Sequence, residues 1–204
     1  MDAATQPGRA ALSERKDDLY ETPACATEAL LAFEGFPRHV WEPACGRGAI
    51  SSVLARYGKV VSSTDLVDYG YGVAGVDFLM ERRVPPVVPP LHAAAIITNP
   101  PFKLANEFAR HALDVIRIPK LALLLRLAFL EGVGRSDILD DGRLARIYPF
   151  RNRLPMMHRD GWKGPRATSA TPFAWFVWDQ QHSGPATIQR ITAIVEPAET
   201  GVGS

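Results

Sequence analysis

The chain has 204 residues, of which 47% are hydrophobic, and a formal net charge of +1. This length supports one sizeable core but not two comfortable domains, no apolar stretch reaches the roughly 20 residues that span a bilayer, and the amino terminus lacks the hydrophobic region of a signal peptide. We therefore expect a cytoplasmic protein with a single α/β domain at 18–195, between flexible tails at 1–17 and 196–204.

The first predicted elements are a helix at 23–34, a strand at 39–44 and a second helix at 49–57. The helices show apolar residues at near-helical spacing, and the strand is short and apolar. Gly46 and Gly48 form a turn between the strand and the second helix. Because glycine allows tight turns, a ligand can approach the backbone closely there, at the amino end of a helix.

This turn is not a dinucleotide fingerprint, because Ser51 stands where the third glycine would be and Glu42 would repel a pyrophosphate. The Glu42 carboxylate suits a cationic or amine-bearing ligand instead. The next strand ends in Asp65, 23 residues after Glu42, about where such folds place the acid that accepts both ribose hydroxyls. Asp77 and Phe78 then offer a carboxylate and a ring that suit the edge and face of an adenine.

The tetrapeptide Asn99-Pro100-Pro101-Phe102 follows an apolar run at 93–98, which predicts a buried strand of a parallel sheet. The prolines end this strand, because neither can donate a hydrogen bond to a neighbour. The Asn99 carboxamide is therefore expected at the carboxyl end of a central strand, where open α/β sheets bind ligands. An amide oxygen beside an aromatic ring suits a planar substrate with an exocyclic amine. Taken alone, the tetrapeptide is equally compatible with a simple turn.

The later part of the chain predicts a helix at 103–117, strands at 121–127 and 173–178 that are apolar on both faces, and an edge strand at 188–195. Between Arg143 and Ala170, seven arginines and lysines stand against one aspartate, interleaved with aromatic residues. Such a segment suits a phosphate backbone and an unstacked base. The alternative is a solvated loop whose arginines keep the protein soluble. The five histidines are scattered and the two cysteines are isolated, so we expect no metal site.

In this order, the motifs resemble those of the S-adenosylmethionine-dependent DNA adenine-N6 methyltransferases. Glu42-Pro43-Ala44-Cys45-Gly46-Arg47-Gly48 is similar to their cofactor loop, and Asn99-Pro100-Pro101-Phe102 is similar to their catalytic motif. Tyr20-Glu21-Thr22-Pro23 resembles the extra cofactor segment that precedes the loop in the gamma arrangement of the family. The segments 123–132 and 174–178 are similar to small phage-encoded members. The resemblance covers residues 18–180.

The resemblance implies a Rossmann-like methyltransferase fold, with a mostly parallel sheet flanked by helices and an antiparallel strand near the carboxyl terminus. It implies S-adenosylmethionine as cofactor, and no metal. The implied catalytic residues are Asn99, Pro100, Pro101 and Phe102. The implied cofactor-binding residues are Tyr20, Thr22, Pro23, Glu42, Pro43, Ala44, Cys45, Gly46, Gly48, Asp65, Asp77 and Phe78. The basic residues that we expect to bind the substrate are Arg126, Arg151, Arg153 and Lys163.

The chain departs from the family in one respect. Gamma enzymes normally carry a sizeable target-recognition domain after the catalytic core, and little of this chain remains for one. A basic insertion near 143–170 or a partner would have to read the target, or the enzyme reads little sequence. DNA is the expected partner, and no membrane is expected. Alternatives are an RNA base or a protein glutamine as substrate, and a nucleic-acid-binding protein without catalysis.

Overall fold

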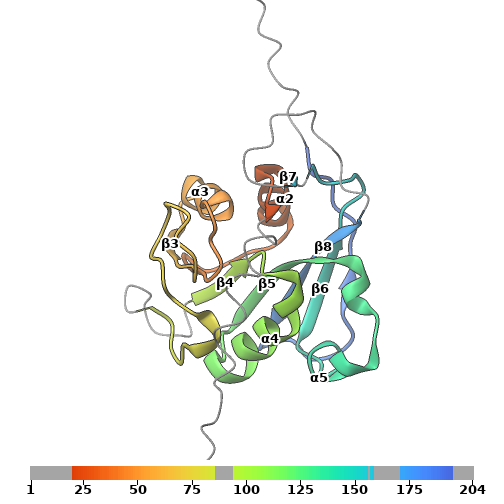
Figure 1. Ribbon diagram of the computed structural model, residues 1–204. Helices are drawn as coiled ribbons and strands as arrows, with labels where there is room; N and C mark the ends of the chain where they lie inside the picture. The colour runs from red at the N-terminus through yellow and green to blue at the C-terminus, as the bar shows by residue number, and fades with distance from the viewer. Residues whose placement is uncertain (1–19, 86–93, 156, 159–170, 195–204) are drawn as a thin grey trace, which may run out of the picture.

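The computed structural model describes residues 20–85, 94–155, 157–158 and 171–194. Its main feature is a seven-stranded sheet with the strand order β3-β2-β4-β5-β8-β6-β9 (Figure 1). The strands are β2 (His39–Glu42), β3 (Val60–Ser63), β4 (Ala94–Thr98), β5 (Lys120–Arg126), β6 (Leu144–Pro149), β8 (Phe173–Asp179) and β9 (Thr187–Ile188). A separate antiparallel pair joins β1 (Tyr20–Glu21) to β7 (Met157–His158).

Strands β3, β2, β4 and β5 are parallel, whereas β8 runs antiparallel to both β5 and β6. This confirms the predicted mostly parallel sheet with an antiparallel strand near the carboxyl terminus. Because β2, β3 and β4 are parallel, their carboxyl ends meet at one edge of the sheet. The residues that follow them, including Asp65 and Asn99, therefore gather at that edge.

Helices cover both faces of the sheet (Figure 1). On one face, α2 (Ala24–Phe33) and α3 (Ala49–Arg56) pack on Val40, Ile97 and Leu124. On the other, α4 (Ala105–Arg110), η4 (His111–Ile116) and α5 (Ser136–Leu139) contribute to the core around Ile96 and Leu123. Because successive side chains of a strand point to opposite faces, neighbours such as Ile96 and Ile97 fill opposite cores. Every residue of β4 is buried, as expected of a strand that is apolar on both faces.

The predicted helix at 103–117 is not one regular helix. It begins as a 3₁₀ turn, η3 (Phe102–Leu104), continues as α4, and ends as the π-helical η4. The wide last turn closes where Ile118 N donates to Ala112 O at 3.0 Å, and Arg117 there has a φ of 57°. The predicted edge strand at 188–195 is reduced to β9 and an isolated bridge at Ile191.

The basic segment, expected as an insertion near 143–170, begins as strand β6, inside the sheet between β8 and β9. Arg143 pairs with Asp114 at 2.9 Å and with Asp141 at 2.5 Å, and Arg146 pairs with Glu34. These two positive charges are therefore paired with acids inside the fold.

Residues 159–170, with Lys163, and the expected tails at 1–17 and 196–204 lie outside the described residues. Within the described part of the chain, no helix is long and apolar enough to cross a bilayer.

Candidate active site

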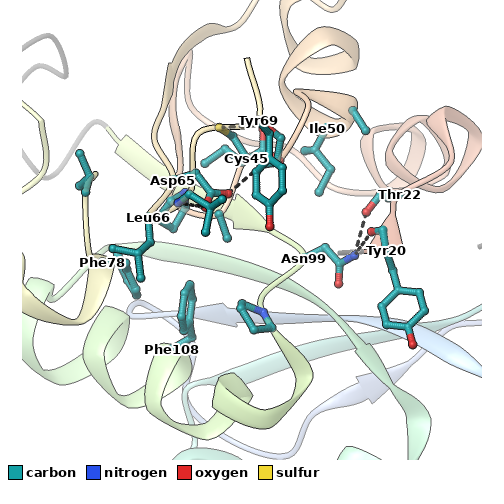
Figure 2. A pocket seen from close by; sticks show the side chains of 18 of the residues that line it. Tyr20, Thr22, Cys45, Ile50, Asp65, Leu66, Tyr69, Phe78, Asn99 and Phe108 are labelled. Carbon is teal, nitrogen blue, oxygen red and sulfur yellow. Dashed lines mark hydrogen bonds between the residues drawn. The ribbon is translucent and has the colours of Figure 1, made fainter. Parts of the chain in front are cut away.

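A pocket opens at the carboxyl ends of β2, β3 and β4 (Figure 2). It brings together most of the residues that the sequence assigns to the cofactor and to catalysis. Of these, the pocket lining contains Tyr20, Thr22, Glu42, Pro43, Ala44, Cys45, Gly46, Asp65, Asp77, Phe78, Asn99 and Pro101. Pro23, Gly48, Pro100 and Phe102 are adjacent in sequence to lining residues but are not among them.

The glycine turn has the backbone conformation that its sequence predicts. Gly46 and Gly48 have φ values of 52° and 82°, in the left-handed region that favours glycine. A Cβ atom at Gly48 would lie 2.5 Å from the ring of Tyr71. Gly48 is therefore required for the packing of Tyr71 behind the turn, while Gly46 lines the pocket itself.

Two carboxylates at the pocket are held in place by backbone N–H groups. Asp65 Oδ2 accepts from Gly46 N at 2.8 Å and Asp65 Oδ1 accepts from Val67 N at 2.9 Å, which ties the end of β3 to the glycine turn. Asp77 Oδ1 accepts from Leu79 N at 3.1 Å and caps the 3₁₀ turn η1 (Phe78–Met80). These bonds fix the direction of both side chains.

Phe78 lines the pocket but is almost completely buried. It is only 2% exposed, and its ring centroid lies 4.7 Å from that of Phe108, 5.2 Å from that of Trp41 and 5.0 Å from that of His111. Phe78 and Phe108 together form the apolar wall of the pocket (Figure 2). The ring is therefore held rigidly by the core that it belongs to.

Glu42 is the fully buried acid of the pocket. It is 1% exposed and accepts a hydrogen bond from the Ser51 hydroxyl, which lies 2.6 Å from the hydroxyl of Ser63. Burial, with a smaller contribution from the charge of Asp65, raises the pKa of Glu42 to about 8, against the opposing effect of Ser51. Burial therefore favours the protonated form of this carboxyl group in the protein without ligand.

The Asn99 carboxamide has a defined orientation. Its Nδ2 donates to Tyr20 O at 3.0 Å and to Thr22 Oγ1 at 3.1 Å (Figure 2). Its Oδ1 is buried and has no hydrogen-bond partner in the described part of the chain. Since a buried acceptor without a partner is costly, this oxygen is suited to accept a hydrogen bond from a ligand.

Phe102, at the end of the Asn99–Phe102 tetrapeptide, packs among other side chains. Its ring centroid is 5.4 Å from that of Tyr20 and 5.7 Å from that of Phe173, and the Arg126 guanidinium carbon lies 4.5 Å above the ring. A second, polar cavity of about 200 Å³ adjoins Phe173. It is lined by Phe150, Arg151, Asn152, Arg153, Pro172 and Phe173. Arg151 and Arg153 thus line a cavity at Phe173, and Arg126 lies over Phe102, the ring that Phe173 contacts.

Sequence reasoning missed several lining residues, namely Leu66, Val67, Tyr69, Val76 and Phe108. Alternating tyrosine and glycine at 69–72 was the available signal, since Tyr71 packs over the turn and Tyr69 faces the pocket.

Burial raises the pKa of the Cys45 thiol to about 12, so it stays protonated. In the described ranges, no group of three or more histidine, cysteine, aspartate or glutamate side chains could hold a metal ion.

No family model matches the sequence, and no curated protein is similar to it. Among solved structures, a modification subunit of a "putative type I restriction enzyme" from Vibrio vulnificus superposes with a TM-score of 0.56 at 14% identity, over 93% of this chain and 49% of that one. A "putative RNA methyltransferase" from Pyrococcus horikoshii gives 0.56 at 12% identity, over 80% and 87%. The chain has a Rossmann-like methyltransferase fold.

A "putative hemolysin" from Lactococcus lactis has the same fold, with a TM-score of 0.52 at 12% identity over 83% of this chain and 91% of that one. The chain spans about half the length of the restriction-enzyme subunit. Because proteins with such different descriptions share this fold, the function of the chain has to be argued from its site.

Proposed function

We propose that this protein transfers a methyl group from S-adenosylmethionine to an exocyclic amine, with adenine N6 in DNA as the substrate. The observation that carries this proposal is the buried, unpartnered Oδ1 of Asn99 beside a pocket that holds oriented carboxylates. An amine N–H is the donor that this oxygen lacks. The gamma order of the segments, in which Tyr20 and Thr22 precede the glycine turn, supports the DNA adenine assignment.

The residues of the pocket at the carboxyl ends of β2, β3 and β4 fit S-adenosylmethionine. Asp65, fixed by Gly46 and Val67, would accept the ribose hydroxyls. Asp77 and the wall formed by Phe78 and Phe108 would bind the adenine. Glu42 would face the amino-acid end, where a cationic group favours its ionised form. When bound, the cofactor supplies a methyl group on a sulfonium, which is already electrophilic.

The substrate amine is a poor nucleophile, because its lone pair is delocalised into the adenine ring. Asn99 Oδ1 and the Pro100 backbone carbonyl would each accept one N6–H. These two acceptors draw the nitrogen towards tetrahedral geometry and stabilise the positive charge that develops on it. N6 would form the new C–N bond with the methyl group that the cofactor supplies, S-adenosylhomocysteine would be the leaving group, and N6 would release one proton to water. Pro101 stiffens the turn that holds both acceptors.

A target base must leave the double helix to reach this site. Phe102 would stack on the extruded base, and Arg151 and Arg153 would contact the phosphate backbone. These two side chains are exposed and line the polar cavity beside Phe173. Two structural neighbours are described as a restriction-enzyme modification subunit and as an RNA methyltransferase, which supports a nucleic-acid substrate.

The deciding experiment supplies labelled S-adenosylmethionine to DNA, RNA and protein pools in parallel and identifies the labelled nucleoside or amino acid. We expect N6-methyldeoxyadenosine, and no label with Asn99→Ala. An exposed arginine at the opposite edge of the sheet provides the matched control, Arg38→Ala. Label in an adenine of RNA would mean that the substrate is RNA and that the reaction is still methyl transfer to an exocyclic amine. Label only in protein would contradict the nucleic-acid assignment.

A further inference from the structure

The ring of Phe102, on which a target base would stack, is in contact with other side chains in the structure. Its neighbours include Tyr20, Phe173 and Arg126. Tyr20 belongs to β1, and its carbonyl accepts a hydrogen bond from Asn99. Phe173 is 6% exposed and is paired with Arg126 across β8 and β5. Arg126 alone of the three is an exposed side chain, at the end of its strand. Of these three side chains, Arg126 is therefore the one that can move away from the ring.

Arg126 also differs from the arginines that the fold uses for structure. Arg110, Arg143 and Arg146 each pair with a carboxylate. Within the described residues, the Arg126 side chain forms no ion pair and no hydrogen bond, and its contact is the ring of Phe102. Its guanidinium donors are thus available next to Phe102, and no acid among the described residues forms an ion pair with them.

The competition for the ring favours a base over the guanidinium. An exposed cation–π contact corresponds to roughly a two- to fivefold preference in an equilibrium constant. Stacking of a nucleic-acid base on an aromatic side chain corresponds to roughly fivefold or more. A displaced guanidinium does not lose its role, because its planar fork matches a phosphate and can bind it with two parallel hydrogen bonds.

We propose that Arg126 is a displaceable cap on Phe102. It covers the ring in the enzyme without substrate, gives way to the target base, and then binds a backbone phosphate next to the target nucleotide. This role rests on the proposed function, since it requires a base to stack on Phe102. Duplex DNA should therefore bind more tightly than an isolated nucleoside. Only DNA carries the phosphate that the displaced Arg126 guanidinium can bind.

The test compares a base without phosphates, deoxyadenosine, with a duplex oligonucleotide, both in the presence of S-adenosylhomocysteine. For Arg126→Ala we expect deoxyadenosine to bind roughly two- to fivefold more tightly, since the competitor for the ring is gone. We expect the duplex to bind about tenfold more weakly, since a charge-assisted phosphate contact is lost. The slope of log K against log salt should fall in magnitude by about 0.9.

Three further variants make the result specific. Arg126→Lys should keep the salt slope of the wild type, because the charge stays. Phe102→Ala should weaken both deoxyadenosine and the duplex, because both lose the ring. Arg38→Ala removes an exposed charge at the opposite edge of the sheet and should change neither affinity.

Two results would overturn the role of Arg126. Weaker binding of both ligands by Arg126→Ala would mean that the guanidinium holds the base directly. Affinities equal to those of Arg38→Ala would mean that Arg126 is outside the substrate site. Both results are compatible with methyl transfer by the wild-type enzyme, so they are distinct from a failure of the proposed function, in which the wild type would methylate no nucleic acid.

Discussion

Asn99 donates a hydrogen bond from its Nδ2 to the hydroxyl oxygen of Thr22, 77 positions earlier in the chain, at 3.1 Å. The resemblance assigns Thr22 to the cofactor, and in the structure its hydroxyl also holds the Asn99 carboxamide. With the Tyr20 carbonyl, it occupies both donors of the carboxamide and leaves Oδ1 as the acceptor. The segment before the glycine turn thus orients the Asn99 amide.

The first prediction separates orientation from binding. Thr22→Val keeps the shape of the side chain but removes the acceptor, so kcat should fall about fivefold, the equivalent of one hydrogen bond of about 1 kcal/mol. Asn99→Ala should abolish transfer. Neither change should alter the affinity for S-adenosylmethionine more than slightly, as calorimetric titration can measure. Near-normal turnover by Asn99→Ala would show that the catalytic assignment is wrong.

The second prediction concerns the ribose acid. Asp65→Ala should weaken S-adenosylmethionine binding about tenfold or more, since hydrogen bonds to a charged acceptor are lost. The variant should also be less stable without ligand, because Gly46 N and Val67 N lose their acceptor. Thermal unfolding with and without S-adenosylhomocysteine measures both effects by mass action. NAD is the control ligand, and a wild-type shift with NAD alone would refute the proposed cofactor.

The third prediction follows from the raised pKa of Glu42. A group with a higher pKa in the folded than in the unfolded state binds more protons when folded, so the free energy of unfolding falls as pH rises between the two values. For Glu42 this interval extends from its ordinary 4.5 to about 8. Glu42→Gln keeps an acceptor for Ser51 and should remove this dependence. Urea unfolding of both proteins from pH 5 to pH 9 measures the difference.

Other groups titrate in the same range, so the comparison between the two proteins is what counts. Burial lowers the pKa of His111, which makes the folded state lose stability as pH falls through the ordinary value of 6.5. Glu42→Gln leaves that effect in place. Parallel stability curves for the two proteins between pH 5 and pH 8 would mean that Glu42 is ionised in the fold.

The fourth prediction concerns the ion pairs at the far edge of the sheet. Glu34, at the end of α2, pairs with Lys120 and Arg146 and accepts a hydrogen bond from Tyr148 at 2.8 Å. Burial would raise the pKa of Glu34, but these partners outweigh it and lower the pKa. Its stabilising effect is therefore present above the ordinary value of 4.5 and is lost as pH falls below it.

Glu34→Ala should destabilise the fold by about 3–5 kcal/mol, because two cations lose their buried partner. Chemical denaturation at pH 7 measures this loss, and the gap to the wild type should narrow in acid. Arg56→Ala, which breaks an exposed pair with Glu28, should cost about 1 kcal/mol or less. Equal losses of stability in Glu34→Ala and Arg56→Ala would contradict the expectation that a buried ion pair stabilises the fold more than an exposed one.

The sequence predicted the site well where the signal is local. The apolar run before Asn99, the two prolines and the glycine turn each determine a short stretch of backbone, and parallel pairing then brings their ends to one edge. The bounds of strand β6 were not predicted, because its arginine and tyrosine are polar. Their partner, Glu34, is 112 positions from Arg146. The raised pKa of Glu42 and the contact between Arg126 and Phe102 depend on tertiary packing, which local patterns do not contain.

The last prediction tests the nucleic-acid surface. Arg151 and Arg153 line the polar cavity beside Phe173, whereas Arg143 and Arg146 of the same segment are paired with acids. Replacing Arg151 and Arg153 together with alanine should reduce the magnitude of the salt slope for duplex binding by about 1.8, at about 0.9 per phosphate contact. All sequences should be weakened about equally, because phosphate contacts position the protein without reading bases.

The matched control removes two arginines from other surfaces, Arg38 and Arg56, with the same change in net charge. Filter binding across salt concentrations with several unrelated duplexes measures both variants. A control that flattens the slope equally would mean that net charge alone drives binding. A flat salt response in the wild type would contradict DNA as the substrate while leaving methyl transfer possible, since the cofactor pocket is formed without either Arg151 or Arg153.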